Sequence, residues 1–202
     1  MAEPKTLANP SVRKARIEML NWPEMKPLTC FVNGLRADHP DYEFPDFDPM
    51  DGGTSAQYLF LFEKPGRRAV ASSGSGFISR DNPDNTAAAI LCFMAKAGIE
   101  RQSTVIWNLV PGWNRTRKVT ASERADGLRS LLDLLILLRK IEAIVLVGNN
   151  AQLVIGSLCG KSYKIFRSLH PSPIVKGTRR KEWNDIWRNW ARVKDSRSKS
   201  DC

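Results

Sequence analysis

The chain has 202 residues, of which 42% are hydrophobic and 26% are charged. This composition excludes a disordered chain and suffices for one domain with a hydrophobic core. A net charge of +10 and a pI of about 9.7 favour a polyanionic partner, nucleic acid first and an anionic membrane surface second, but also suit a basic protein without such a partner.

The cysteines and the apolar segments indicate the cellular compartment of the protein. The sequence contains four cysteines and no CxxC pair: Cys30, Cys92, Cys159 and Cys202. We expect reduced, mostly buried thiols and a cytoplasmic protein, rather than a disulfide or a metal site. The N-terminal residues lack the apolar stretch of a signal peptide. The longest apolar run, Leu131 to Leu138, contains Asp133 and is too short to span a bilayer.

We predict that residues 1–55 form an N-terminal extension that packs on the core. Residues 1–15 are polar, and Ser11 can cap a short helix that runs to Leu20. Residues 36–53 contain five aspartates and several prolines, which is typical of an irregular surface segment. We assign no chemistry to these aspartates.

From residue 56 onward, short apolar runs alternate with helical segments. Strands are predicted at residues 57–63, 104–110, 143–147 and 163–169, and helices at 86–97, 120–139, 150–158 and 179–193. Thr120 followed by Glu123 indicates a capping box at the start of the longest helix. The alternation predicts an α/β domain with a parallel sheet over residues 56–194. The charged tail at 195–202 is predicted to be disordered.

Polar or special residues follow each predicted strand. They are Glu63, Asn108, Gly148 and His170. Because ligands of open α/β sheets bind at the carboxyl ends of the strands, we expect these residues to converge on one pocket.

Two of these residues carry the clearest chemical signals. His170 lies in a His-Pro-Ser-Pro segment, whose prolines stiffen the loop and favour a catalytic over a structural histidine. Asn108 ends a buried strand, where its amide offers a donor and an acceptor to the Watson–Crick edge of a base. The alternative for Asn108 is a residue that caps the following turn.

Two loops between the first strand and the first helix can also contribute. The turn at residues 63–66, Glu-Lys-Pro-Gly, and the Ser/Gly-rich segment 72–77 can bring backbone amides close to a ligand. Neither is a P-loop or a GxGxxG motif. In segment 80–86, Asp84 or Asn85 can cap the helix, or one aspartate can position a water.

Together these features resemble the uracil-DNA glycosylase superfamily, over about residues 58–190. Residues 62–66, Phe-Glu-Lys-Pro-Gly, match its first motif, and residues 170–172, His-Pro-Ser, match its second. Phe77 matches the aromatic residue that stacks on uracil, and Asn108 matches the residue that binds the uracil edge. The resemblance implies a three-layer α/β/α sandwich with a central four-stranded parallel sheet.

The sequence departs from the family pattern in the first motif. Phe62 replaces the usual glycine, and Lys64 stands where the best-known branch has a water-activating aspartate. A protonated lysine cannot act as a general base, so we predict that Asp81 takes this role, with Glu63 and Asp84 as further candidates. The cysteine spacing of the iron–sulfur branches is absent, so we predict no cluster.

The resemblance implies a monomeric enzyme that flips uracil out of single- or double-stranded DNA and hydrolyses its N-glycosidic bond, with no metal or organic cofactor. Phe77 would stack on the base, and Asn108 would bond its O4 and N3 atoms. His170 would stabilise negative charge near O2, together with backbone amides of the loop that contains Lys64 and Gly66.

The motif loops also carry candidates for DNA contact. Basic residues flank them: Lys64, Arg67, Arg68, Lys176, Arg179 and Arg180. Ser172 can bond a phosphate, and Ile174 or Val175 can fill the gap left by the extruded base. The tryptophans of the last predicted helix are expected to pack in the core rather than stack on bases.

Three other functions stay open at this point. Lys64 near the sugar would allow a Schiff base, as in a glycosylase with lyase activity. The missing aspartate also suits a protein that binds uracil or abasic DNA with weak or no turnover. An unrelated basic α/β enzyme acting on nucleotides would leave DNA that contains uracil uncut.

Overall fold

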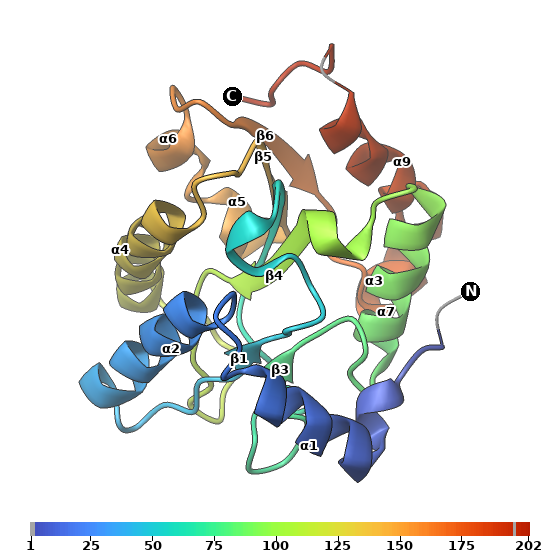
Figure 1. The fold of residues 1–202 in the computed structure, drawn as a ribbon. Coiled ribbons are helices and arrows are strands. Elements are labelled where there is room, and N and C mark those ends of the chain that lie inside the picture. The colour runs from blue at the N-terminus through green and yellow to red at the C-terminus, as the bar shows by residue number, and fades with distance from the viewer. Residues whose placement is uncertain (1–2, 196) are drawn as a thin grey trace.

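The computed structural model describes residues 3–195 and 197–202. Within these residues a four-stranded parallel sheet of order β4-β2-β5-β6 forms the centre of the molecule (Figure 1). Its strands are β2 (Tyr58–Phe62), β4 (Thr104–Asn108), β5 (Ala143–Val147) and β6 (Lys164–Ser168). The four predicted strands and the α/β class are confirmed.

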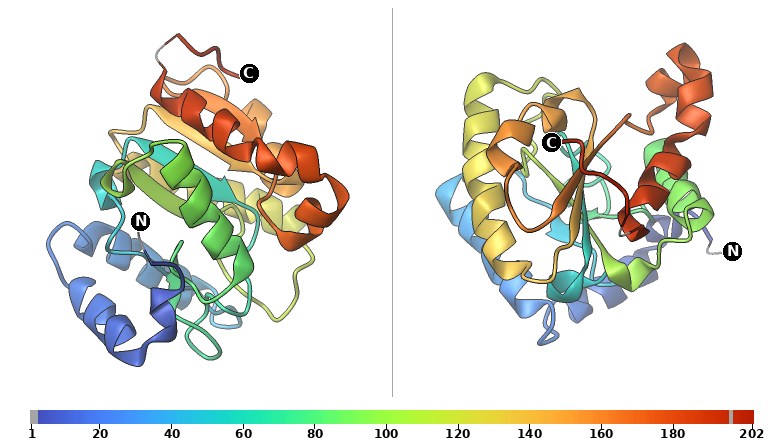
Figure 2. Two further views of the ribbon diagram at one scale, coloured as in Figure 1. Left: turned by 90° about the vertical axis from the view of Figure 1, so that its right-hand side faces the viewer. Right: turned by 90° about the horizontal axis from the view of Figure 1, so that it is seen from above.

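Helices cover both faces of this sheet. On one side lie α3 (Asn85–Lys96) and α9 (Ile186–Ala191), and on the other lies α4 (Ala121–Leu137), packed against α2 (Lys26–Asp38) (Figure 2). Every residue of β4 and β5 is buried, as expected for strands that are covered on both faces. The three-layer α/β/α arrangement is therefore confirmed.

The helices begin where the side chains supply caps. The Asp84 carboxylate accepts a hydrogen bond from the Ala87 amide and caps α3. Thr120 and Glu123 form the predicted capping box of α4. No helix in the described part of the chain is both long and apolar enough to cross a membrane.

Two predicted helices are divided into shorter ones. The segment after β5 forms α5 (Asn149–Gln152) and α6 (Ile155–Leu158), and the C-terminal segment forms α7 (Pro173–Thr178), α8 (Arg180–Asn184) and α9. The C-terminal helices break at Arg179 and Asp185. Trp183 packs against Phe93, and Trp190 is fully buried and donates a hydrogen bond to Ser168. Trp190 therefore lies in the core as expected, while Trp183 and Trp187 are partly buried and pack against it.

The N-terminal extension is more regular than its sequence indicates. Helix α1 (Pro10–Met19) is capped by Asn9 rather than by Ser11, and α2 was not predicted. Strand β1 (Asp46–Phe47) pairs in parallel with β3 (Phe77–Ile78). Phe47 stacks on Trp107 at 3.8 Å between ring centroids, so this small sheet lies against the end of β4.

A buried network of ion pairs joins the extension to the core. Arg16 of α1 binds Asp48 and Asp81, and Arg101 binds the same two carboxylates and Asp51. Burial raises the pKa of Asp51 to about 6 although arginines adjoin it. The aspartates of segment 36–53 are thus not all surface groups, because Asp48 and Asp51 are buried.

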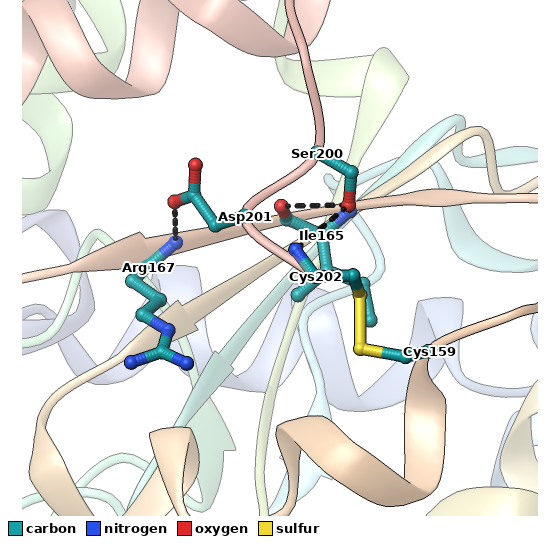
Figure 3. The surroundings of a disulfide bond; sticks show 6 residues. All are labelled: Cys159, Ile165, Arg167, Ser200, Asp201 and Cys202. Atoms are coloured by element: carbon teal, nitrogen blue, oxygen red, sulfur yellow. Dashed lines mark hydrogen bonds between the residues drawn. A yellow bond between two sulfur atoms is a disulfide. The ribbon is translucent and has the colours of Figure 1, made fainter.

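The cysteines and the C-terminal tail differ from the sequence predictions (Figure 3). Cys159 forms a disulfide with Cys202, while Cys30 and Cys92 are free and exposed rather than buried. The expectation of reduced, mostly buried thiols is therefore wrong, and the argument from thiols for a reducing compartment no longer holds.

The same tail was predicted to be disordered, but its last residues bind the outer edge of β6. The Asp201 amide donates to the Ile165 carbonyl, and the Asp201 carboxylate accepts from the Arg167 amide. Charge and polarity favoured disorder, yet these bonds and the disulfide hold residues 200–202 against the sheet.

Candidate active site

Asn108 and His170 both neighbour Phe62 at the carboxyl edge of the main sheet. Phe62 ends β2 and pairs in register with Asn108, the last residue of β4. Side chains of paired residues in a parallel sheet point to the same face. The Phe62 ring also contacts the His170 ring edge-on at 5.5 Å between centroids. Phe62, which sequence reasoning treated only as a departure from the family motif, thus pairs with Asn108 in the sheet and contacts the His170 ring.

The loop after β6 presents His170 as a largely buried, unpaired imidazole. Its Nδ1 atom is buried and has no hydrogen-bond partner among the described residues. Burial lowers the pKa of His170, and this effect outweighs the negative charges of Glu63 and Asp84, which act against it. The ring is therefore neutral at neutral pH and keeps one N–H group to donate.

Glu63 and Asp84 are the carboxylates that act on His170. One Glu63 oxygen accepts a hydrogen bond from the Asn150 amide at 2.8 Å, at the start of α5. Gly148 makes room for this carboxylate, since a Cβ atom there would lie 2.6 Å from Glu63 Oε1. Asp84 caps α3 through one oxygen, Oδ1. Each carboxylate thus stands at the site edge on a helix start.

Asp81 was the first choice from sequence for positioning water, but its carboxylate is occupied by ion pairs with two arginines. Its carboxylate binds Arg16 at 2.5 Å and Arg101 at 2.8 Å, and the residue is 3% exposed. Although burial raises the pKa of Asp81, the two arginines outweigh it and hold that pKa below its usual value. These bonds argue for a structural role, which the sequence could not reveal because Arg16 lies 65 residues away.

The Lys64 side chain is bound by polar groups of the connection between β4 and α4 and of α4 itself. Its ammonium binds Glu123 at 2.6 Å, Asn114 at 2.7 Å and the Lys118 carbonyl at 3.1 Å, and its side chain is 3% exposed. The ammonium is therefore not free for a phosphate, contrary to the sequence prediction. Of the groups of Lys64, its backbone amide stays a candidate for the uracil site, beside Gly66.

Phe77 is held in β3, outside the main hydrophobic core. Its amide donates a hydrogen bond to Ser75 Oγ, and its carbonyl accepts one from Asn82. The residue is 1% exposed. A base can therefore stack on this ring only if a covering group moves aside.

The residues predicted to contact DNA lie mostly at the surface. Ser172 caps α7 by accepting a hydrogen bond from the Val175 amide, which leaves its hydroxyl proton free for a phosphate. Ile174 is 73% exposed, the most exposed large hydrophobic residue of the described chain, whereas Val175 is half-buried. The exposed basic residues on these loops are Arg67, Arg68, Lys176, Arg179 and Arg180.

Sequence reasoning overlooked a positively charged loop near this edge. The charge of Arg117, in the connection between β4 and α4, acts on His170 and lowers the pKa of that histidine. The run Arg-Thr-Arg-Lys at residues 115–118, directly after a strand with a site residue, was the available signal.

Comparisons with known proteins point to one family. A family profile described as "Uracil DNA glycosylase superfamily" matches residues 49–194. Among the solved structures that match is a variant mimivirus UNG in complex with UGI, at 17% sequence identity, covering 78% of this chain and 73% of that chain with a TM-score of 0.44. The wild-type UNG of Nitratifractor salsuginis is 14% identical and covers 91% of this chain and 98% of that chain, with a TM-score of 0.43. No curated protein sequence matches the chain.

Proposed function

The chain belongs to the uracil DNA glycosylase superfamily, and from this premise we propose that it hydrolyses the N-glycosidic bond of uracil in DNA and leaves an abasic site. Residues 56–194 form the glycosylase domain of this proposal. The target nucleotide must be extruded, because its glycosidic bond is out of reach inside a duplex. The partners are DNA that contains uracil and free uracil as product.

Base recognition falls to Asn108. This residue ends β4 and is 5% exposed, so a base bound to its amide would be largely shielded from water. The amide oxygen accepts the N3 proton of uracil and the amide nitrogen donates to O4. Cytosine presents the opposite pattern at these two atoms, and a site built for one pattern rejects the other. Phe77 provides the stacking surface once its ring is uncovered.

His170 stabilises the leaving group. When the bond between the sugar C1′ and uracil N1 breaks, its electron pair stays on uracil and charge accumulates on O2. A neutral imidazole donates its one N–H group to that oxygen, and burial keeps the ring neutral by lowering the pKa of His170. The Phe62 ring fixes the imidazole from one side.

Glu63 is the preferred candidate for orienting the attacking water and for stabilising the positive charge on the sugar. One of its oxygens is bound by Asn150, which fixes the carboxylate, and the other has no hydrogen bond to the described residues. A negative charge at this edge offsets the oxocarbenium-like sugar, and the free oxygen orients a water toward C1′. The water supplies hydroxide to C1′ and its proton passes to the carboxylate. Asp84 is the second candidate.

Contacts with DNA come from the two motif loops. Ser172 donates its hydroxyl proton to a phosphate, and Arg67, Arg179 and Arg180 add positive charge. Ile174 enters the gap left by the extruded base, since it is exposed and close to the His-Pro-Ser segment.

The observation that carries the proposal is the pairing of Phe62 with Asn108 and its ring contact with His170, in a chain of this family. The test incubates the protein with single- and double-stranded DNA carrying one uracil, then cleaves abasic sites with alkali. Strand scission is expected with the wild type and should fall sharply in Asn108→Ala and His170→Ala. If no strand scission is seen at any enzyme concentration, the proposed glycosylase activity is refuted.

A second candidate is a protein that binds uracil or abasic DNA with weak or no turnover. The lysine at position 64 and the covered Phe77 ring favour it, since both depart from an open site with a water-activating acid. Tight binding of abasic DNA without release of uracil would support this candidate. A lyase is disfavoured because three oxygens bind the Lys64 amine, and borohydride trapping of a covalent adduct would identify one.

A further inference from the structure

A short basic loop joins β4 to α4 at the carboxyl edge of the main sheet. Residues 114–118, Asn-Arg-Thr-Arg-Lys, form this basic loop, and Arg115, Arg117 and Lys118 are all exposed. No acidic residue occurs between residues 109 and 122. The local charge is therefore not offset along the chain.

The backbone of the basic loop is fixed at both ends. Before it, Trp113 and Glu43 exchange two backbone hydrogen bonds of 2.8 and 2.9 Å. Within it, Lys64 binds the Asn114 side chain at 2.7 Å and the Lys118 carbonyl at 3.1 Å. A single buried ammonium therefore clamps the loop, and the exposed cations project from a fixed backbone.

The charges of the basic loop are also unpaired. Among the described residues, Arg115, Arg117 and Lys118 form no ion pair, whereas Arg129, Arg179 and Arg188 each bind an acid three residues away. Unpaired, closely spaced cations raise the local positive potential and attract polyanions.

The basic loop lies next to the candidate active site. Asn108 ends the strand that precedes it, and the charge of Arg117 reaches His170. Lys64, which directly follows Glu63, binds Asn114 and the Lys118 carbonyl of the basic loop. The basic loop therefore lies beside the first-motif loop, at the edge of the sheet that carries Asn108.

We propose that the basic loop binds backbone phosphates of DNA beside the active site, through Arg115, Arg117 and Lys118. The inference rests on the proposed function in that DNA is the partner. It adds a third contact surface to those on the two motif loops, and it explains why a buried ion pair holds an otherwise polar connection in place.

Binding is measured by fluorescence anisotropy on a duplex that carries a stable abasic analogue, which the protein cannot turn over. The variant is Arg117→Gln with Lys118→Gln. The matched control is Arg139→Gln with Lys140→Gln, two exposed cations that precede β5 and so lie at the opposite edge of the sheet. Both variants lower the net charge by the same amount, and thermal melting checks that both fold.

Each lost phosphate contact reduces the slope of log affinity against log salt by about 0.9 on duplex DNA. We expect a reduction of about 1.8 and a loss of affinity of roughly tenfold or more near physiological salt for the loop variant, with the slope unchanged in the control. Equal changes in both variants, or no change in either, would overturn the inference. Normal uracil excision with an unchanged slope would refute this inference alone, whereas a reduced slope without excision would refute only the glycosylase.

Discussion

Replacing Lys64 with methionine tests how the first-motif loop is held. The side chains of Lys64 and Glu123 are 3% and 11% exposed, and their nitrogen and oxygen lie 2.6 Å apart. Removing one partner of a buried pair costs about 3–5 kcal/mol, because the other charge is left uncompensated. Glu123 keeps hydrogen bonds from Tyr42 and the Thr120 amide, so we expect the lower end, about 3 kcal/mol.

The same variant should change the acid sensitivity of the fold. Burial raises the pKa of Glu123, but hydrogen bonds from Lys64, Thr120 and Tyr42 outweigh it and bring that pKa from 4.5 to about 2. A carboxyl group whose pKa falls on folding stabilises the protein above its unfolded pKa and loses this stabilisation as the pH drops through its folded pKa. The wild type should therefore lose stability between pH 4.5 and 2, and Lys64→Met should lose less over that range.

Urea denaturation at neutral pH and between pH 4.5 and 2 measures both effects. Arg129→Met is the control, since its ion pair with Asp126 is exposed and should contribute about 1 kcal/mol or less. The reasoning fails if Lys64→Met costs no more than this control, or if its pH dependence matches that of the wild type. Uracil excision per folded molecule should persist in Lys64→Met.

Four further substitutions test structural, catalytic and DNA-binding roles. Asp81→Asn should lower the free energy of unfolding by about 3 kcal/mol in urea denaturation, with excision retained. Glu63→Gln keeps an acceptor for the Asn150 amide and should slow excision by about a hundredfold or more in single-turnover assays. The reverse pattern would restore Asp81 as the carboxylate that activates water. Cys202→Ser opens a link between residues 43 apart and should cost about 4 kcal/mol in the oxidised protein, with no difference under reductant; an equal stability of both proteins without reductant would contradict the disulfide. Ile174→Ala should slow excision from duplex DNA but not from single strands, and equal slowing on both would exclude a wedge.

Local patterns predicted the elements that depend on local physics. The apolar runs of β2, β4 and β5 are buried on both faces, so they read directly as strands, and Thr120 with Glu123 marked the start of α4. Helix α2 was missed because only Leu28 and Val32 are buried among polar neighbours. Its stability comes from packing on α4, which the sequence does not display.

For the site, too, local patterns predicted positions, but not the bonds between residues remote in sequence. The position of Asn108 and His170 at one edge could be predicted because Asn108 ends β4 and His170 follows β6, and parallel strands bring their carboxyl ends to one edge. The role of Asp81 was not predictable, because its partner Arg16 is remote in sequence. The pairing of Cys159 with Cys202 is equally non-local.

The most direct test of the account is the rate at which free uracil appears, followed by chromatography under single-turnover conditions, from otherwise identical DNA strands that carry uracil or cytosine at one position. The account predicts release of uracil and no release of cytosine by the wild type, with large losses of rate in Asn108→Ala and His170→Ala. Rates in these two variants that equal the wild type, or no base released from either strand, would contradict it.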